Sequence, residues 1–436
     1  MTEIIIMGVF AAILLVCLAA DVSILAALLM GYMLFFGYSL YKRHGVRETI
    51  KFSLDGIKTI KNILITFALI GIITGVWRAS GTIAFIVCEA VKFCSPKVMV
   101  LASFLLCSLV SLLTGTSFGT AATMGVICMT VSDSMGVPSI LSGGAVLSGC
   151  LFGDRCSPMS TSALLISELT GTDIYTNIKN MVKTALVPTI AAIIIYLVLG
   201  LFAGGGASAG SAVAALEAYF NMNPVMLLPA ISIILMSLFK TEVKLKMAVS
   251  IVLASFAAVF VQKIGVKELF HVMIFGFTPS EAAAAKLISG GGVISMGRVI
   301  GIVCLSSCFS GIFRGTGFLD EIKQYIQKLS CKTNVYTVIL IVSLLTGLVA
   351  CNQTLCIMLT YQLCEELEKD RDTMAVHLEN TAVLTAPLVP WSIAGTVPLD
   401  SAGAPHMSII TGFYLYLVPV WRMIVEARKK KALQAK

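Results

Sequence analysis

The sequence is poor in charged residues, which make up only 12% of its 436 positions, whereas 58% are hydrophobic. Ordinary soluble domains carry roughly twice that charged fraction. A soluble protein of this length could not bury so much apolar surface. The formal net charge of +8 therefore does not indicate nucleic-acid binding, and a lipid bilayer is the expected surrounding.

Recognisable metal-binding and catalytic patterns are also lacking. The thirteen cysteines are scattered without a C-x-x-C pair, and the four histidines fall near predicted helix ends. Single cysteines of this kind are usually apolar filler. The sequence contains no H-E-x-x-H, and its two G-x-S-x-G matches, Gly115–Gly119 and Gly206–Gly210, have no histidine nearby in sequence. We therefore expect no enzyme, no bound metal cofactor and no other cofactor, beyond transported Na⁺ or H⁺.

Long apolar runs recur from end to end, including residues 4–20, 22–41, 98–113, 187–203 and 335–349. A membrane-spanning helix needs about 20 apolar residues, and fewer where re-entrant segments share the depth. By that criterion roughly ten to thirteen segments qualify. The predicted fold is an all-α polytopic membrane protein.

Basic residues gather at the ends of these runs. The second run is followed by Lys42-Arg43-His44 and then by Arg47, Lys51, Lys58 and Lys61. The tail contains Arg428-Lys429-Lys430-Lys431. Under the positive-inside rule this places both termini in the cytoplasm. The first run follows Met1-Thr2-Glu3 without a basic region, so it is interpreted as a retained helix of a cytoplasmic-membrane protein.

The two halves of the chain contain three matching stretches in the same order. Gly75–Gly81 resembles Gly311–Gly317, Val110–Gly115 recurs as Val342–Gly347, and Ala145–Ser148 resembles Ala382–Thr385, at offsets of 236, 232 and 237 residues. Such duplication is common in secondary transporters, where substrate binds at the repeat interface. The predicted organisation is residues 1–203 as the N-terminal helices and first repeat, 204–223 as a Gly/Ser-rich linker that begins with the flexible tract Gly204–Ser211, and 224–436 as the second repeat with a C-terminal helix and basic tail.

Polar, glycine-rich or proline-containing breaks interrupt the apolar runs at matching places. Thr114–Thr120 corresponds to Cys351–Thr354, and Gly153–Pro158 corresponds to the stretch from Pro387 to Thr396. Non-helical backbone survives at membrane depth only inside protein or beside a water-filled cavity. Interrupted helices in both halves are the best sequence-level indication of a transport site.

Asp154 and Arg155 are the most conspicuous residues, because a charge at the bilayer centre costs about 2.5–3.5 kcal/mol on insertion scales. They could lie in a surface loop or form a mutually neutralised pair. The functional interpretation is that Asp154 binds a cation or proton, while Arg155 orients it or contacts an anionic group. Arg78 and Arg314 occupy equivalent repeat positions and fit helix-end residues that reach for water, or a carboxylate site.

These motifs resemble the NhaC family of sodium/proton antiporters, which belongs to a group of transporters built from two inverted repeats. The resemblance rests on Gly115–Ala121, Ser148–Ser160 and Leu378-Glu-Asn380, and covers about residues 60–420. The inverted arrangement is implied by the family, since the residues alone leave the number of spans per half open. Two acids usual in the family are absent, because Thr161 and Asn352 stand at those places.

We therefore predict an NhaC-like secondary active transporter that performs Na⁺/H⁺ antiport, with Asp154 as the Na⁺ ligand. The alternative is a Na⁺- or H⁺-coupled carrier of an organic acid or amino acid; a passive channel fits the repeats less well. Partners are the bilayer and a small ion or solute, and a homodimer is left open. The predicted ion- or substrate-binding residues are Asp154, Arg155, Thr116, Ser117, Ser157, Ser160, Thr161, Asn352, Gln353, Thr354 and Glu379.

Overall fold

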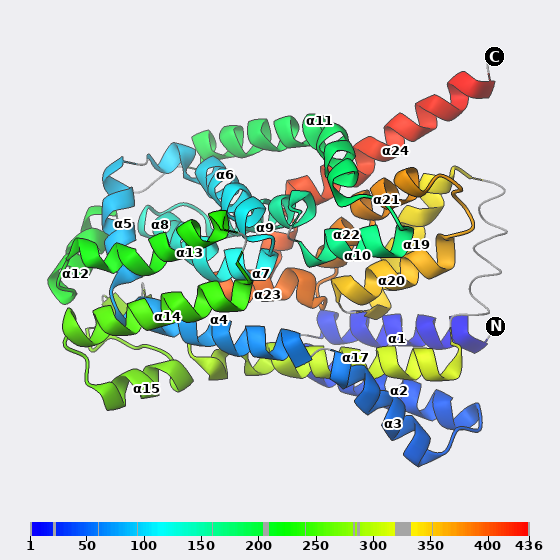
Figure 1. The fold of residues 1–436 in the computed structure, drawn as a ribbon, viewed down its shortest axis with the longest axis horizontal. Helices are drawn as coiled ribbons and strands as arrows, with labels where there is room; N and C mark the ends of the chain where they lie inside the picture. Colours follow the sequence, from blue (N-terminus) through cyan, green and yellow to red (C-terminus); the bar gives the residue numbers. More distant parts are fainter. Residues whose placement is uncertain are drawn as a thin grey trace.

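The computed structural model is mostly helical in the part of the chain that it describes. The described residues are 2–20, 23–59, 61–93, 95–158, 160–203, 209–239, 241–281, 284–285, 288–318, 333–350 and 352–434. Most helices run along the long axis of the molecule, and both termini lie at the same end of it (Figure 1). The predicted all-α polytopic fold is confirmed.

The first half begins with a hairpin of two apolar helices and continues into a densely packed bundle. Its helices are α1 (Thr2–Ala19), α2 (Ile24–Tyr41), α3 (Val46–Thr59), α4 (Lys61–Ala79), α5 (Thr82–Phe93), α6 (Pro96–Thr114), α7 (Ser117–Thr120), the π-helical turn Ala121–Gly125, α8 (Val126–Ser134), α9 (Ser139–Cys156), α10 (Thr161–Thr170) and α11 (Ile174–Phe202).

The second half starts with short helices and ends in a long one. Its helices are α12 (Ala209–Tyr219), the 3₁₀ turn Pro224–Leu227, α13 (Leu228–Leu238), α14 (Val243–Phe260), α15 (Val266–Phe275), the 3₁₀ turn Val293–Met296, α17 (Gly297–Thr316), α19 (Val335–Ala350), α20 (Gln353–Cys364), α21 (Arg371–Asn380), α22 (Ala382–Thr385), the 3₁₀ turn Ala386–Leu388, α23 (Ile393–Ala402), the 3₁₀ turn His406–Ile409 and α24 (Phe413–Gln434).

Few of the apolar segments are straight, uninterrupted spans. Among the described residues, four helices are long and apolar enough to cross a membrane: Pro96–Thr114, Ile174–Phe202, Val293–Thr316 and His406–Arg428. Three more candidates are pairs of helices that bend by 59° to 109° at a short break, and three others are shorter apolar helices. The predicted ten to thirteen segments are approached only when broken and short helices are included.

The predicted Gly/Ser linker is in part a helix. Residues 204–208 lie outside the described residues, but Ala209–Tyr219 forms α12, which packs against α5 and α8. The stretch Ala212–Glu217 is rich in Ala, Leu and Glu, which favour helix more strongly than Gly210 and Ser211 oppose it. Within the predicted linker, residues 209–219 are therefore helical.

Helix ends occur at equivalent places in the two halves. Gly81 and Gly317, which are 236 positions apart, both take the left-handed conformation that ends a helix, with φ of +76° and +63°. Thr116 and Asn352, also 236 apart, both have extended backbone and cap the next helix by accepting a backbone N–H three residues on. These matching caps support the predicted duplication.

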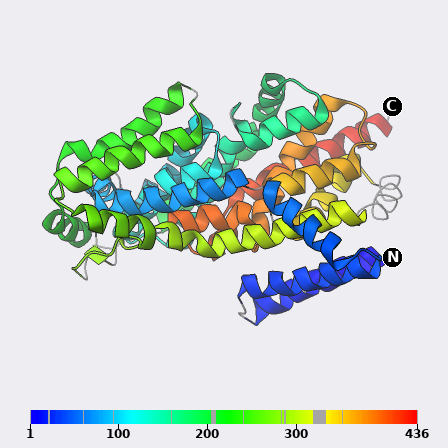
Figure 2. The ribbon, with the colours of Figure 1, turned by 60° about the horizontal axis from the view of Figure 1, so that its bottom comes forward.

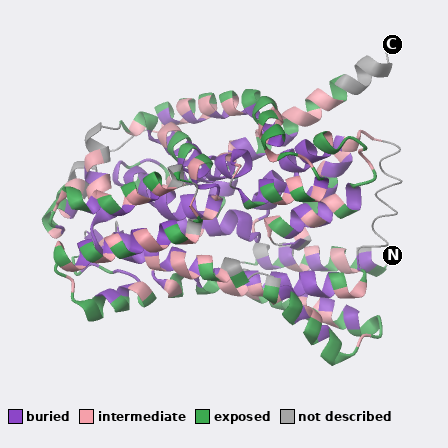
Figure 3. Cartoon of the chain, viewed as in Figure 1, coloured by how far each residue is buried: buried purple, intermediate pink, exposed green. Residues whose placement is uncertain are grey.

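Buried residues occupy the middle of the molecule, and exposed residues cover its outer helices (Figure 3). The outer surface of α11 carries Leu186, Ile190, Ile194 and Leu201, all exposed. Apolar residues on the outside of an already apolar helix are typical of contact with lipid. The molecule is therefore apolar outside, and its buried polar side chains lie inside the bundle.

The α1–α2 hairpin lies along one flank of the molecule (Figure 2) and is attached by aromatic side chains. The Phe35 ring centroid lies 5.0 Å from that of Phe10 on α1 and 4.7 Å from that of Phe313 on α17, in edge-to-face geometry. Such pairs add about 0.5–1.5 kcal/mol each beyond burial of their area. These contacts join the hairpin firmly to α17.

Close contact between α6 and α9 depends on glycine. A Cβ at Gly153 would lie 2.2 Å from the backbone nitrogen of Leu112, and one at Gly149 would lie 2.5 Å from the carbonyl oxygen of Phe104. Small residues let helix backbones approach closely inside membranes. The close approach brings the C-terminal end of α9 next to the break that separates α6 from α7.

We predict that Gly153→Ala separates α6 from α9, because the added methyl group meets backbone rather than a movable side chain. The cost should be at least about 1–3 kcal/mol, the usual range for overpacking. The apparent melting temperature of the detergent-purified protein measures it. Gly37→Ala on α2, where a Cβ meets nothing within 4 Å, is the matched control. Equal melting temperatures for the two variants would contradict this packing account.

Candidate functional site

Asp154 lies in the last turn of α9, where two helix breaks meet. Its side chain is 4% exposed. Ser117 Oγ donates to Asp154 Oδ2 at 3.2 Å, and Ser160 Oγ donates to Asp154 Oδ1 at 2.8 Å. Ser117 begins α7 and Ser160 caps α10, so both serines stand at the start of a helix that follows a break. The predicted grouping of Asp154, Ser117 and Ser160 is thus present.

The last turn of α9 is a favourable place for a cation. Carbonyl oxygens at the C-terminal end of a helix lack intrahelical partners and carry partial negative charge. Ser157 is buried directly after this end and has extended backbone, which stops the helix. Carboxylate, hydroxyl and carbonyl oxygens are the ligands that hard cations prefer. The surroundings of Asp154 therefore offer the types of oxygen that hard cations prefer.

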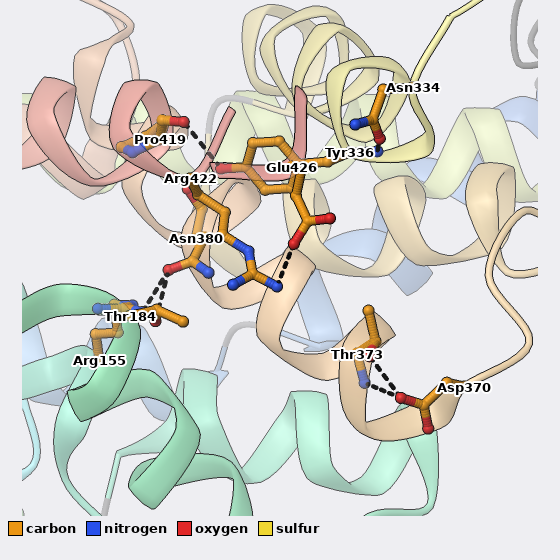
Figure 4. Close-up of polar contacts among 10 residues, drawn as sticks. All are labelled: Arg155, Thr184, Asn334, Tyr336, Asp370, Thr373, Asn380, Pro419, Arg422 and Glu426. Atoms are coloured by element: carbon orange, nitrogen blue, oxygen red, sulfur yellow. Dashed lines mark hydrogen bonds and ion pairs between the residues drawn. The ribbon is translucent and has the colours of Figure 1, made fainter. Parts of the chain in front are cut away.

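Arg155, the next residue, points to the other side of α9 and is completely buried. Its Nε donates to the carbonyl oxygen of Glu379 at 3.1 Å, and one terminal nitrogen donates to the hydroxyl of Tyr414 at 3.0 Å. The other terminal nitrogen donates to Asn380 Oδ1 at 2.5 Å and to Thr184 Oγ1 at 3.3 Å (Figure 4). Arg155 thus joins α9 to α11, α21 and α24.

Glu379 completes a group of three buried ionisable side chains. It is 1% exposed, and neither carboxylate oxygen accepts a hydrogen bond within the described part of the chain. Its carboxylate interacts electrostatically with Arg155 and, more weakly, with Asp154. Glu379 lies near the end of α21, where Thr381 departs from helical geometry with φ −118° and ψ −84°. Glu379, one of the predicted binding residues, therefore lies in the protein interior.

The remaining predicted residues have other surroundings. Thr116 is half-buried and caps α7, and Asn352 caps α20 by accepting from the backbone nitrogen of Leu355 at 2.8 Å. Gln353 donates from Nε2 to the carbonyl oxygen of Val383 at 2.9 Å, which ties α20 to α22. Thr161 and Thr354 are exposed. Within the described residues, none of Asn352, Gln353 and Thr354 hydrogen-bonds to Asp154 or its two serines.

Sequence reasoning missed three partners of Arg155. Thr184 and Tyr414 lie within apolar helices whose sequences resemble ordinary membrane spans. Asn380 entered the sequence analysis only as part of the motif Leu378-Glu-Asn380. Tyr336, another buried aromatic, donates to the carbonyl oxygens of Asn380 at 3.4 Å and Pro419 at 3.2 Å (Figure 4). Isolated polar residues in apolar helices offer no sequence signal that assigns them to one arginine.

A cavity of about 620 Å³ opens between α11, α21 and α24. Its lining is strongly polar and includes Asn180, Lys183, Thr184, Asp370 and Arg422. Thr184 both lines this cavity and hydrogen-bonds to Arg155, so the cavity reaches the outer edge of the buried charge group.

The two arginines noted at equivalent repeat positions are not part of this group. Arg78 is half-buried and donates to the carbonyl oxygen of Thr74 at 3.2 Å in its own helix. Arg314 is exposed and donates to Ser310 Oγ at 3.0 Å, again within one helix. Both fit the helix-end interpretation.

Arg155→Lys should destabilise the protein, because one ammonium group cannot reach all four acceptors that the planar guanidinium contacts. Each buried acceptor left unpaired costs about 1–3 kcal/mol. We expect the apparent melting temperature in detergent to fall by several degrees. Arg314→Lys, on the exposed side of α17, should leave it unchanged; a similar fall in both variants would contradict the linking role of Arg155.

Thr184→Cys should react with a charged, membrane-impermeant thiol reagent, because the cavity admits water to this position. Ser148→Cys, at a completely buried position beside Tyr196, should stay unmodified. The unsubstituted protein supplies the background from the native cysteines. Mass spectrometry of the intact protein measures the extent of labelling, and equal protection of both cysteines would show that the cavity is closed to water.

Comparison with known proteins places this arrangement in a family. The model of the "Na+/H+ antiporter family" matches residues 1–164 and 149–425. The chain is 27% identical to the malate-2H⁺/Na⁺-lactate antiporter of Bacillus subtilis (strain 168), over 97% of this chain and 93% of the relative. It is also 27% identical to the Na⁺/H⁺ antiporter NhaC of the same organism, over 86% of each chain. The arginine/ornithine antiporter ArcD of Halobacterium salinarum is 26% identical, over 78% of this chain and 73% of the relative. The apolar broken helices, the buried ionisable group and the match over most of the sequence lead to one conclusion: the chain belongs to the Na⁺/H⁺ antiporter family.

Proposed function

We propose that the protein exchanges Na⁺ for H⁺ across the cytoplasmic membrane by alternating access. The observation that carries the proposal is the buried group of two carboxylates and one guanidinium, Asp154, Glu379 and Arg155. When all three are ionised, this group has one net negative charge in a medium where an uncompensated charge costs several kcal/mol. Either one Na⁺ or one H⁺ makes it neutral. The two ions therefore compete for the same group, and competition of this kind is the basis of exchange.

The two carboxylates, Asp154 and Glu379, have surroundings that suit different ions. Asp154 already has two serine hydroxyls and the carbonyl end of α9 around it, so we assign Na⁺ to Asp154. Ser157 and Thr116, beside the same two breaks, are further candidate oxygen ligands. The carboxylate oxygens of Glu379 accept no hydrogen bond within the described residues, so we assign the proton to Glu379. Arg155 positions both by holding α9 against α21.

Membrane orientation follows from charge. Both termini lie at one end of the molecule (Figure 1), and exposed Lys42, Arg43 and Arg428 belong to segments that adjoin them in sequence or in space. Cytoplasmic loops carry the excess of Lys and Arg. We therefore assign this end to the cytoplasm.

We predict that Asp154→Asn and Glu379→Gln abolish the internal alkaline shift that external Na⁺ causes in proteoliposomes containing a pH dye. The response should fall below about a tenth of that of the unsubstituted protein, since a loss of 1.4 kcal/mol already changes an equilibrium tenfold. Glu268→Gln, which removes an exposed carboxylate from α15, is the control and should retain the response. Full Na⁺-driven exchange by Asp154→Asn would overturn the assignment.

Thermal stability separates the two roles. Na⁺ should raise the melting temperature of the unsubstituted protein, because a ligand that binds only the folded state stabilises it. Asp154→Asn should lose this increase, because it removes the Na⁺ ligand. Glu379→Gln leaves Asp154 and Arg155 as an already neutral pair, so it should weaken the increase and remove its dependence on pH. An increase in Glu379→Gln equal to that of the unsubstituted protein would show that Na⁺ and H⁺ do not compete for one charge.

A second candidate is exchange of an organic acid or amino acid coupled to Na⁺ or H⁺. The cavity of about 620 Å³ beside Thr184 favours it, because pockets for small organic ligands fall in the range of about 300–1,000 Å³ and a bare ion needs far less room. Two relatives are named for malate, lactate, arginine or ornithine. The same proteoliposomes distinguish the candidates: a Na⁺ response that requires one carboxylate or amino acid from an added panel would make that solute the substrate.

A further inference from the structure

The helix α3 has no part in the site described above, and it has an unusual distribution of side chains. It is 14 residues long, which gives about 21 Å, too short for a span. It carries Arg47, Glu48, Lys51, Asp55 and Lys58, and it is not among the candidate membrane spans. It follows α2 at the end of the molecule where both termini lie (Figure 1). Its chemistry therefore differs from that of the bundle helices.

One face of α3 is buried and fixes the helix rigidly. A Cβ at Gly56 would lie 2.0 Å from the carbonyl oxygen of Ser307, and one at Gly311 would lie 1.9 Å from that of Phe52. The backbones of α3 and α17 are therefore in direct contact. Thr49 shares a hydrogen bond of 2.8 Å with Ser39, which also ties α3 to α2. The rotation of α3 about its axis is set by these contacts.

A second face is apolar and exposed. Val46, Ile50 and Leu54 are spaced four residues apart and are 54%, 45% and 51% exposed. Residues at this spacing form one stripe along a helix. Nothing in the described part of the chain covers this stripe.

A third face, about a quarter-turn further round, is basic. Arg47, Lys51 and Lys58 are exposed, and neither Arg47 nor Lys51 forms an ion pair among the described residues, whereas Lys58 pairs with Asp55 at 2.8 Å. Glu48 and Asp55 lie beyond the basic stripe, on the side away from the apolar one. Around the exposed surface the order is apolar, basic and then acidic.

This order matches the layers of a membrane surface. Apolar side chains of an interfacial helix enter the acyl-chain boundary, basic side chains meet lipid phosphates, and acidic side chains face water. Each Lys or Arg near an anionic surface contributes about 1 kcal/mol of attraction. A protein partner would be expected to meet the acidic side as well, whereas an anionic bilayer accounts for the order of all three stripes.

We propose that α3 lies in the membrane–water interface and binds anionic phospholipid headgroups through Arg47 and Lys51, with Val46, Ile50 and Leu54 in the acyl-chain boundary. Because α3 touches α17 through backbone atoms, the bound lipid also anchors α17 at this end of the molecule. The site is distinct from the buried ionisable group and does not depend on the transported ion.

Native mass spectrometry of the purified protein with phosphatidylglycerol or phosphatidylcholine tests the headgroup contact. The double variant Arg47→Gln/Lys51→Gln should bind phosphatidylglycerol roughly ten- to thirtyfold more weakly and phosphatidylcholine as before. Lys263→Gln/Lys267→Gln makes the same charge change at two exposed positions near the start of α15 and should have no effect. Unchanged phosphatidylglycerol binding by the first variant, or equal loss in the second, would overturn the proposal.

Fluorescence quenching by acyl-chain-brominated lipid tests the depth of α3. Leu54→Trp should add a quenched component to the signal of the three native tryptophans, and Glu48→Trp on the water side should add an unquenched one. Quenching of neither new tryptophan, together with a dimer in solution, would identify the apolar stripe as a contact between copies of the chain and refute the lipid assignment.

Discussion

A buried guanidinium that must be fully hydrogen-bonded is the constraint on which the rest of the site depends. Arg155 is shielded from water, and a buried charge with an incomplete set of partners is strongly destabilising. Its acceptors come from α11, α21 and α24, and one of them is the backbone carbonyl of Glu379. All four helix segments must therefore be in place at once. In the conformation described, this requirement fixes how the two halves of the chain are arranged around the neighbouring carboxylates.

The breaks in the helices supply what a continuous helix cannot. Inside a membrane every backbone group needs a partner, so an interrupted helix is stable only when side chains take over at the break. Thr116, Ser160, Asn352 and Ser392 each do so by capping the following helix. Of these four caps, only Ser160 also donates to a carboxylate, Asp154. The same residue thus closes a break and contributes to the candidate ion site.

The two positions where acids usual in the family are absent have different consequences in this structure. Thr161 is exposed in the first turn of α10. A threonine instead of an acid at this position therefore lowers the negative charge at the surface of the site and leaves its centre unaffected. Asn352 uses its amide to cap α20 and to contact Ala350, roles that need no negative charge. The buried group therefore keeps its own balance of two acids and one base without them. With this balance, the proposed binding of a single cation requires neither of the two absent acids.

Composition and periodicity determined the fold class, because 58% hydrophobic residues in long runs have no stable arrangement other than membrane helices. Sequence matching also predicted the breaks, because helix caps and turns are local features. Ser160 lies in the same motif as Asp154, whereas Ser117 is 37 positions away and was grouped with Asp154 because it lies beside another break. The partners of Arg155 could not be predicted: Thr184, Asn380 and Tyr414 are 29 to 259 positions away and carry no common pattern. The helix at residues 209–219 reflects the Ala, Leu and Glu residues after Ser211, which favour helix more strongly than the Gly and Ser residues at its start oppose it. Helix caps and breaks depend on residues that are close together in the sequence. Contacts between distant residues depend on which helix faces pack together, and only the tertiary structure decides that.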